Sequence, residues 1–206
     1  MPVALALVLT PCAALAQQVD ADWILRALAR PAPTRTDFVE VRDSALLKQP
    51  LRLRGEYLRP DADTLVREVR SPYAETTTIR AGEARIVRAG KPARAFSLSR
   101  APELASLHDS FGALLAGDRI ALERAYRIRS DGERRRWKLS LTPKAPVLAA
   151  RVREIVLYGQ GAELRCIETL PVKGLAQRTL LAGAARAMKA ETSAAAVEAM
   201  CRAGAG

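Results

Sequence analysis

Aromatic side chains and histidine are scarce in this chain of 206 residues. Phe, Trp and Tyr together make up 4% of the sequence, whereas hydrophobic residues reach 49%. A core or cavity must therefore be built mainly from Leu, Val, Ile and Ala, and a flat stacking surface for nucleotide bases is not expected. A Ser-His-Asp or Cys-His site would have to use the one histidine, His108. Its neighbours Asp109 and Ser110 point in other directions on a helix and cannot complete a triad with it.

Recognisable metal and nucleotide motifs are also absent from the sequence. There is no CxxC, HExxH, EF-hand loop, P-loop or GxGxxG. Four glutamates, Glu40, Glu56, Glu68 and Glu75, fall on or beside expected strands, where two of them could face each other as an acid and base pair. Surface pairing with the abundant arginine explains them better. We therefore predict a protein that is not an enzyme and that uses no metal ion or cofactor.

The first sixteen residues, MPVALALVLTPCAALA, carry no charge. They end in Ala14-Leu15-Ala16, a small-x-small pattern that suits cleavage by signal peptidase before Gln17. The apolar run is too short to cross a bilayer comfortably as a permanent helix, and no later segment approaches that length. We expect residues 1–16 to be a signal peptide for export and the mature protein to be soluble. An uncut membrane anchor is the alternative.

Three cysteines are present, and Cys12 would leave with the signal peptide. The remaining pair, Cys166 and Cys201, would meet an oxidising compartment after export. They are candidates for one disulfide. Two buried free thiols acting as small hydrophobic side chains are an equally good interpretation.

The formal net charge of +11 suggests an anionic partner. The arginines and lysines, however, are spread along almost every expected strand and alternate with apolar residues. This pattern is typical of the solvated face of a sheet. We therefore expect no nucleic-acid partner, and transient contact with an anionic membrane surface if the charge has a partner at all.

The residue pattern predicts one mainly β domain with helices, built on about ten antiparallel strands curled into a barrel or half-barrel. A short helix over 20–30 ends at Pro31, a second spans 102–116, and an Ala-rich helical tail begins at 184. Asp131-Gly132 lies between two alternating runs and predicts a hairpin turn. We expect the domain to cover 17–183 and the tail 184–206. The expected strands are 38–41, 51–57, 64–69, 76–80, 83–88, 94–98, 120–129, 135–141, 152–158, 163–170 and 175–181.

Two stretches of the sequence resemble the outer-membrane lipoprotein carrier family, the LolA-type periplasmic chaperones. The first is LRGEYLRP at 53–60, followed by VRSPYAET at 69–76 and IRAG at 79–82. It resembles the family's order of glycine, apolar strand, Arg-Pro turn, strand, proline, Thr/Ile strand and glycine hairpin. The second, WKLSLTPK at 137–144, is similar to the family's central Leu-x-Pro strand end. The resemblance covers roughly 23–181.

Membership of this family implies an incomplete antiparallel barrel wrapped over an apolar cavity, with helices as a lid. The acyl chains of a lipoprotein would occupy the cavity between an inner-membrane transporter and an outer-membrane acceptor. Arg59 matches the family arginine that holds the lid closed by hydrogen bonds to helix backbone. The helix with Leu104, Leu107 and Phe111 would form part of the lid.

The inward-facing side chains of the expected strands are the candidates to line the cavity. They are Leu51, Leu53, Tyr57, Leu65, Ile79, Ile86, Phe96, Leu98, Leu122, Tyr126, Trp137 and Leu139. We therefore expect a monomeric periplasmic carrier of lipoprotein or lipid acyl chains. The alternatives are a non-transporting periplasmic interaction module and a divergent carrier of a non-lipoprotein lipid in lipid-export machinery.

Overall fold

The structure of the protein, a computed structural model, describes residues 19–42, 50–100 and 112–203. Its eleven strands form one sheet in the order β6-β5-β4-β3-β2-β1-β11-β10-β9-β8-β7, and the paired strands are antiparallel. The strands are β1 (Thr34–Arg42), β2 (Leu51–Arg59), β3 (Leu65–Ser71), β4 (Glu75–Arg80), β5 (Glu83–Arg88), β6 (Arg94–Ser97), β7 (Tyr126–Glu133), β8 (Arg136–Pro143), β9 (Val152–Gln160), β10 (Glu163–Pro171) and β11 (Gln177–Leu181). The helices are α1 (Ala21–Leu28), α3 (Arg119–Ala125), α4 (Pro146–Ala149), α5 (Ala182–Ala187) and α6 (Ala194–Arg202), with the 3-10 turn η1 (Leu98–Arg100). Residues 112–116 are also helical.

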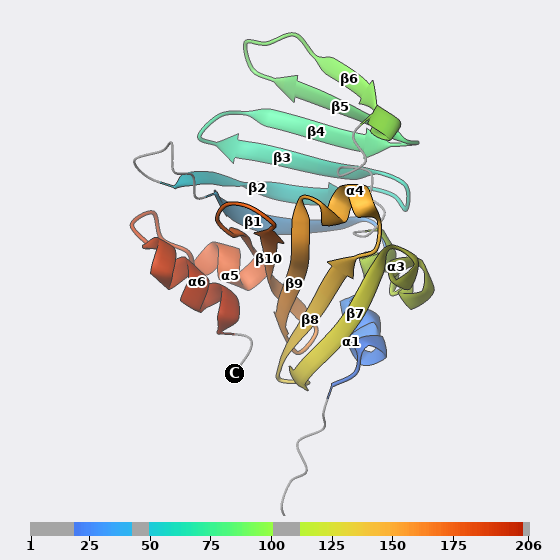
Figure 1. The fold of residues 1–206 in the computed structure, drawn as a ribbon. Helices are drawn as coiled ribbons and strands as arrows, with labels where there is room; N and C mark the ends of the chain where they lie inside the picture. The colour runs from blue at the N-terminus through green and yellow to red at the C-terminus, as the bar shows by residue number, and fades with distance from the viewer. Residues whose placement is uncertain (1–18, 43–49, 101–111, 204–206) are drawn as a thin grey trace, which may run out of the picture.

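The sheet is open, with β6 and β7 as its two edges. In Figure 1, β2 to β6 run across the view while β7 to β9 run steeply down it, so the sheet twists strongly between its halves. Strand β1 pairs with β2 on one side and β11 on the other, and it joins the two halves. The predicted mainly β architecture, an incomplete antiparallel barrel with helices, is confirmed.

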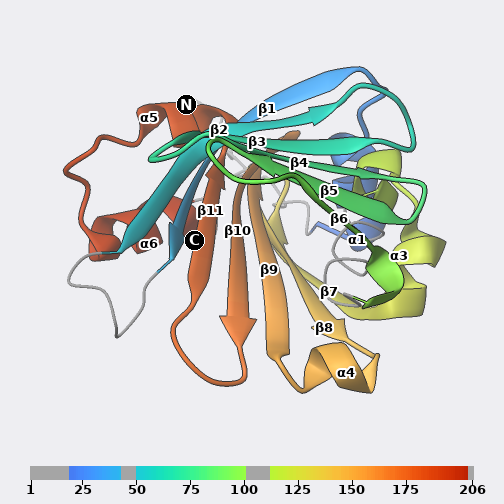
Figure 2. The same cartoon turned by 90° about the horizontal axis from the view of Figure 1, so that it is seen from above.

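Helices pack against both faces of the sheet. On one, here called the inner face, Ile24 and Leu25 of α1 join Tyr126 and Trp137 in a cluster of buried side chains. On the other, here called the outer face, α5 and α6 cover β1, β9, β10 and β11 through a second cluster. Figures 1 and 2 show α1 and α3 beside β7, and α5 and α6 on the other side of the molecule.

Local sequence explains the limits of α1. The carboxylate of Asp20 accepts the backbone N–H of Trp23 at 2.7 Å, which caps the first turn. Ile24, Leu25 and Leu28 fall at helical spacing and are buried. The helix ends at Leu28, with Ala29 as its C-cap, shortly before Pro31, which cannot continue it.

The prediction of a strand over 120–125 is wrong, because these residues form α3. Asp118 caps the helix by accepting the N–H of Ala121 at 2.9 Å. Arg119 and Glu123 add an ion pair one turn apart, at 2.7 Å. Leu122, predicted on a strand, is therefore buried from a helix.

The hairpin turn predicted at Asp131-Gly132 is displaced. Strand β7 continues through both residues, Glu133 pairs with Arg136, and the reversal falls on 134–135. Gly132 has φ +95°, and a Cβ there would lie 2.4 Å from the carbonyl oxygen of Arg136. The glycine therefore allows a close approach of β7 to β8 rather than the reversal itself.

Candidate functional site

A pocket lies on the inner face, where the end of α1 and residues 112–116 approach the sheet. Its volume is about 260 Å³. The lining residues are Leu28, Arg30, Thr34, Thr36, Tyr57, Leu58, Arg59, Leu65, Leu114, Leu115, Ala162, Glu163, Leu164, Leu181 and Ala182. Aliphatic side chains dominate, and only a few polar groups interrupt them. A concave apolar site with few polar groups is the usual form of a small-molecule binding site.

The register of β1 and β2 builds one wall of the pocket. Tyr57 lies opposite Thr36, and Arg59 lies opposite Thr34. Because side chains alternate along a strand, these four residues share the inner face. Leu65, at the start of β3, extends the same wall.

Arg59 links this wall to the end of α1. Its Nη1 donates to the carbonyl oxygen of Arg30 at 2.9 Å. The contact agrees in kind with the lid-holding arginine that the family resemblance implies, and a role of Arg59 in holding a ligand stays a prediction. Arg59 therefore connects the sheet to the segment that leaves α1.

Arg30 makes the larger set of contacts. Its Nη1 donates to the carbonyl oxygens of Ala27 and Ala29, each at 2.8 Å, and its Nη2 donates to that of Ala162 at 2.8 Å. Its backbone N–H donates to the carbonyl oxygen of Leu115 at 3.0 Å. One residue thus joins α1, the helix that ends at 116 and the β9–β10 turn. We call Arg30 and Arg59 the latch.

Arg30 was not among the residues predicted from the sequence. One local signal was available, since a cation directly after a helix can bond its last carbonyl groups. The bond to Ala162 joins residues 132 positions apart. No local pattern indicates a contact of that range.

A charged cluster lies on the inner face beside the pocket. Glu40 is 6% exposed and pairs with Arg42 and with Arg67, whose Nη2 lies 2.6 Å from Oε2 of Glu40. Arg67 also lies over the ring of Phe38, 4.9 Å from its centroid. Burial raises the pKa of the Tyr57 hydroxyl in this cluster. The buried carboxylate is thus compensated, and its neighbours are held in place.

The predicted cavity residues are distributed over the whole inner side of the fold. Tyr57 and Leu65 line the pocket. The packed cluster under α1 and α3 holds Leu122, Tyr126, Trp137 and Leu139; Leu51 and Leu53 pack with Phe38; and Ile79, Phe96 and Leu98 form a small cluster near β6. Ile86 is partly buried on β5. Contact of any of these residues with a ligand stays a prediction.

The lid candidates Leu104, Leu107 and Phe111, and also His108, lie outside the described residues, as do the predicted signal peptide and Cys12. The described helical residues that follow in the sequence, 112–116, contribute Leu114 and Leu115 to the pocket.

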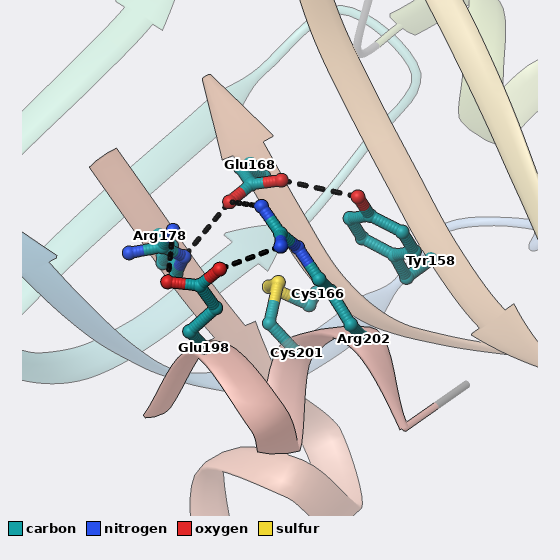
Figure 3. The surroundings of a disulfide bond; sticks show 7 residues. All are labelled: Tyr158, Cys166, Glu168, Arg178, Glu198, Cys201 and Arg202. Carbon is teal, nitrogen blue, oxygen red and sulfur yellow. Dashed lines mark hydrogen bonds and ion pairs between the residues drawn. A yellow bond between two sulfur atoms is a disulfide. The ribbon is translucent and has the colours of Figure 1, made fainter. Parts of the chain in front are cut away.

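Cys166 and Cys201 form a disulfide on the outer face, with Cα atoms 5.1 Å apart. Cys166 lies on β10 and Cys201 on α6, and both are fully buried. Figure 3 shows the bond beneath a group of charged side chains. The bond fixes α6 to the face of the sheet opposite the pocket.

Glu168 is the centre of that charged group, at 1% exposed. Its carboxylate accepts hydrogen bonds from Arg178 at 2.8 Å, from the hydroxyl of Tyr158 at 3.0 Å and from Arg202 at 3.3 Å. Burial, followed by the nearby Glu168 charge, raises the pKa of Tyr158 to about 12. Glu198 of α6 pairs with Arg178 at 2.9 Å, so the network ties helix to sheet (Figure 3).

Two of the glutamates considered as an acid and base pair do lie opposite each other. Glu56 of β2 faces Glu68 of β3 in the register, but Arg70 pairs with both, at 2.7 Å and 3.0 Å. Neither of them lines the pocket. Across the described ranges, no three His, Cys, Asp or Glu side chains are grouped as metal ligands.

Comparison with known families settles the relationship of the chain. The family described as "Outer membrane lipoprotein carrier protein LolA-like" matches residues 13–204. The chain belongs to the LolA-like family. The resemblance seen in the sequence is therefore confirmed, and proteins of the LolA-like family are periplasmic. No described helix has both the length and the hydropathy needed to cross a membrane.

Two solved structures are similar to this LolA-like chain. A LolA superfamily protein from Nitrosomonas europaea, NE2245, is 13% identical, with 80% of this chain and 91% of that chain covered at a TM-score of 0.40. LprF from Mycobacterium bovis is 14% identical, with 79% and 91% covered at a TM-score of 0.34. No curated protein matches the sequence.

Proposed function

We propose that this LolA-like protein is a periplasmic carrier that shields an acyl chain of a lipoprotein or lipid during transfer toward the outer membrane. The observation that carries the proposal is the aliphatic pocket between α1, residues 112–116 and the sheet, whose rim is bridged by hydrogen bonds of Arg30 and Arg59. The proposed role is binding and release rather than catalysis.

The size of the pocket suits one chain at a time. Sites for drug-sized ligands begin at about 300 Å³, and this pocket holds about 260 Å³. Each methylene that leaves water contributes about 0.8 kcal/mol. The volume is therefore suited to part of one saturated chain rather than to several chains.

The lining also suits release. Flexible aliphatic side chains make few directional contacts, so the affinity for a bound chain comes from the apolar area that it buries and not from specific hydrogen bonds. A latch of four hydrogen bonds to backbone carbonyl oxygens can open without unfolding the sheet. In this proposal a donor in the inner membrane supplies the chain, an acceptor in the outer membrane removes it, and the carrier works as a monomer.

Uptake of a fluorescent fatty-acyl probe by the purified mature protein tests the proposal. We expect saturable uptake by the wild type. Leu65→Trp adds volume to a half-buried pocket wall and should weaken uptake about tenfold or more. Leu175→Trp is the matched control, because Leu175 is 59% exposed and lies outside the pocket, and it should bind as the wild type does.

Mass spectrometry of an organic extract of the purified protein would identify the cargo class. A lipoprotein anchor and a non-lipoprotein lipid give different masses. If the folded wild type shows no saturable uptake and carries no lipid, the carrier proposal fails, and a non-transporting interaction module becomes the better interpretation.

A further inference from the structure

The β7–β8 hairpin carries a surplus of positive charge at one end of the sheet. Residues 127–138 contain six basic and two acidic side chains. We call this segment the basic hairpin. Strand β7 is an edge strand, so one side of the segment has no neighbouring strand in the sheet.

The arginines of the basic hairpin are turned to solvent. Arg127 and Arg129 share the outer face of β7, and both are exposed. Arg135 and Arg136 are exposed at the reversal. Among the acidic residues of the segment, Asp131 is already paired with Lys138, at 2.9 Å.

Four arginines of the segment form no ion pair with a described carboxylate: Arg127, Arg129, Arg135 and Arg136. They are also not needed for packing, because they are exposed. Arg134 differs, since its guanidinium lies 5.3 Å from the ring centroid of Trp23 in α1. Glu133 lies opposite Arg136 in the register, but the basic side chains of this tip outnumber the acidic ones and face solvent, where an external anion can reach them.

The basic hairpin adjoins the wall of the pocket. The carbonyl oxygen of Arg134 accepts the N–H of Gly161 at 3.0 Å, and Nε1 of Trp137 donates to the carbonyl oxygen of Gly161 at 2.8 Å. The next residue, Ala162, lines the pocket and is held by Arg30 of the latch. The basic hairpin and the latch therefore contact neighbouring residues of the same β9–β10 turn.

We propose that the basic hairpin docks this carrier on the anionic phospholipid headgroups of a bilayer. The inference rests on the proposed carrier function, because it presents the latch side of the pocket to the surface from which a lipid comes. Clustered exposed arginines match a dense array of phosphates in charge. Nucleic acid is less suited, since the ring of Trp23 lies under the guanidinium of Arg134 and Trp137 is fully buried, so neither ring offers a stacking platform.

Binding to vesicles tests the inference with the full mature chain. The probes are vesicles of phosphatidylcholine alone and of phosphatidylcholine mixed equally with phosphatidylglycerol, measured by co-sedimentation. Each arginine near an anionic surface strengthens binding about fivefold. We expect the wild type to bind the mixed vesicles and not the neutral ones, with binding lost as salt rises.

The triple variant R129Q/R135Q/R136Q should lower binding to the mixed vesicles on the order of 100-fold. The matched control is R80Q/R85Q/R100Q, which removes the same charge from exposed positions on β4, β5 and η1 and should change binding by about threefold at most. Both variants should take up the acyl probe in the absence of vesicles as the wild type does, which also shows that they are folded.

An equal loss in both triple variants would mean that net charge alone attracts the protein, and it would overturn the inference. Equal wild-type binding to neutral and anionic vesicles would also overturn it. If a duplex oligonucleotide displaces the protein from the vesicles at a lower concentration than that of the lipid, the basic hairpin binds nucleic acid in preference to lipid, and the inference is wrong. Loss of probe uptake by the wild type would count against the carrier function instead, so the two failures are distinguishable.

Discussion

In the proposed carrier, Arg59 is the residue that we expect to control how fast a bound acyl chain dissociates. A hydrogen bond from a charged donor contributes about 1.5–3 kcal/mol when buried, and less at this partly exposed position. Arg59→Leu removes the bond to the carbonyl oxygen of Arg30 and leaves the pocket wall apolar. We expect an acyl probe to dissociate about fivefold faster, measured by stopped-flow competition.

Arg35→Leu is the matched control for that change. Arg35 lies on β1 opposite Leu58, next to the residue that faces Arg59, so its side chain is on the outer face, where it is largely exposed. Its release rate should match that of the wild type. Equal release rates for the Arg59 and Arg35 variants would show that the bond between Arg59 and the end of α1 does not limit release.

The role of Arg59 could be predicted from the sequence, whereas that of Arg30 could not. Arg59 sits in an Arg-Pro turn that resembles a family pattern, so its position could be carried over. Arg30 gains its importance from two carbonyl oxygens far along the chain, those of Leu115's helix and of Ala162. Such partners depend on tertiary packing, which single-sequence patterns do not contain.

Among the elements, α6 depends most on a covalent bond. The Cys166–Cys201 disulfide closes a separation of 35 residues, which corresponds to about 3–4 kcal/mol of lost chain entropy in the unfolded state. Cys201→Ser should lower the free energy of unfolding by about that amount, measured by chemical denaturation. Reductant should lower the stability of the wild type similarly and leave the variant unchanged. Probe uptake should persist in both, because α6 covers the face opposite the pocket.

The element boundaries show what alternation predicts and where it fails. Strand β5 was predicted at its observed limits, Glu83–Arg88, because apolar and charged residues alternate between two glycine turns. The run before Tyr126 also alternates, yet it folds as α3 since Asp118 caps it and its residues favour a helix. The turn predicted at Asp131-Gly132 was wrong because Gly132 is needed for the close contact between β7 and the backbone of Arg136. That contact exists only in the folded sheet and leaves no local pattern in the sequence.

On the scale of the whole molecule, the inner face extends well beyond the pocket. The register carries one row of side chains from Leu65 of the pocket wall through Ile79 and Ala84 to Phe96 at the edge of the sheet. On the other side of the pocket, Trp137 and Tyr126 are fully buried in a packed core. We therefore expect a chain too long for the pocket to continue along β3 to β6, where this row ends at the half-buried Phe96, rather than toward the fully buried Trp137 and Tyr126.

Acyl probes of different length should then show whether a long chain contacts β3 to β6. We expect Phe96→Ser to weaken binding of a hexadecanoyl probe about tenfold, because a large half-buried contact is lost, and to leave binding of an octanoyl probe unchanged. Val87→Ser is the control, since Val87 is 44% exposed on the outer face of β5. Fluorescence titration of both probes measures the difference. An equal effect on the two probes would place the end of the long chain elsewhere, and would leave the pocket beside the latch as the whole of the binding site.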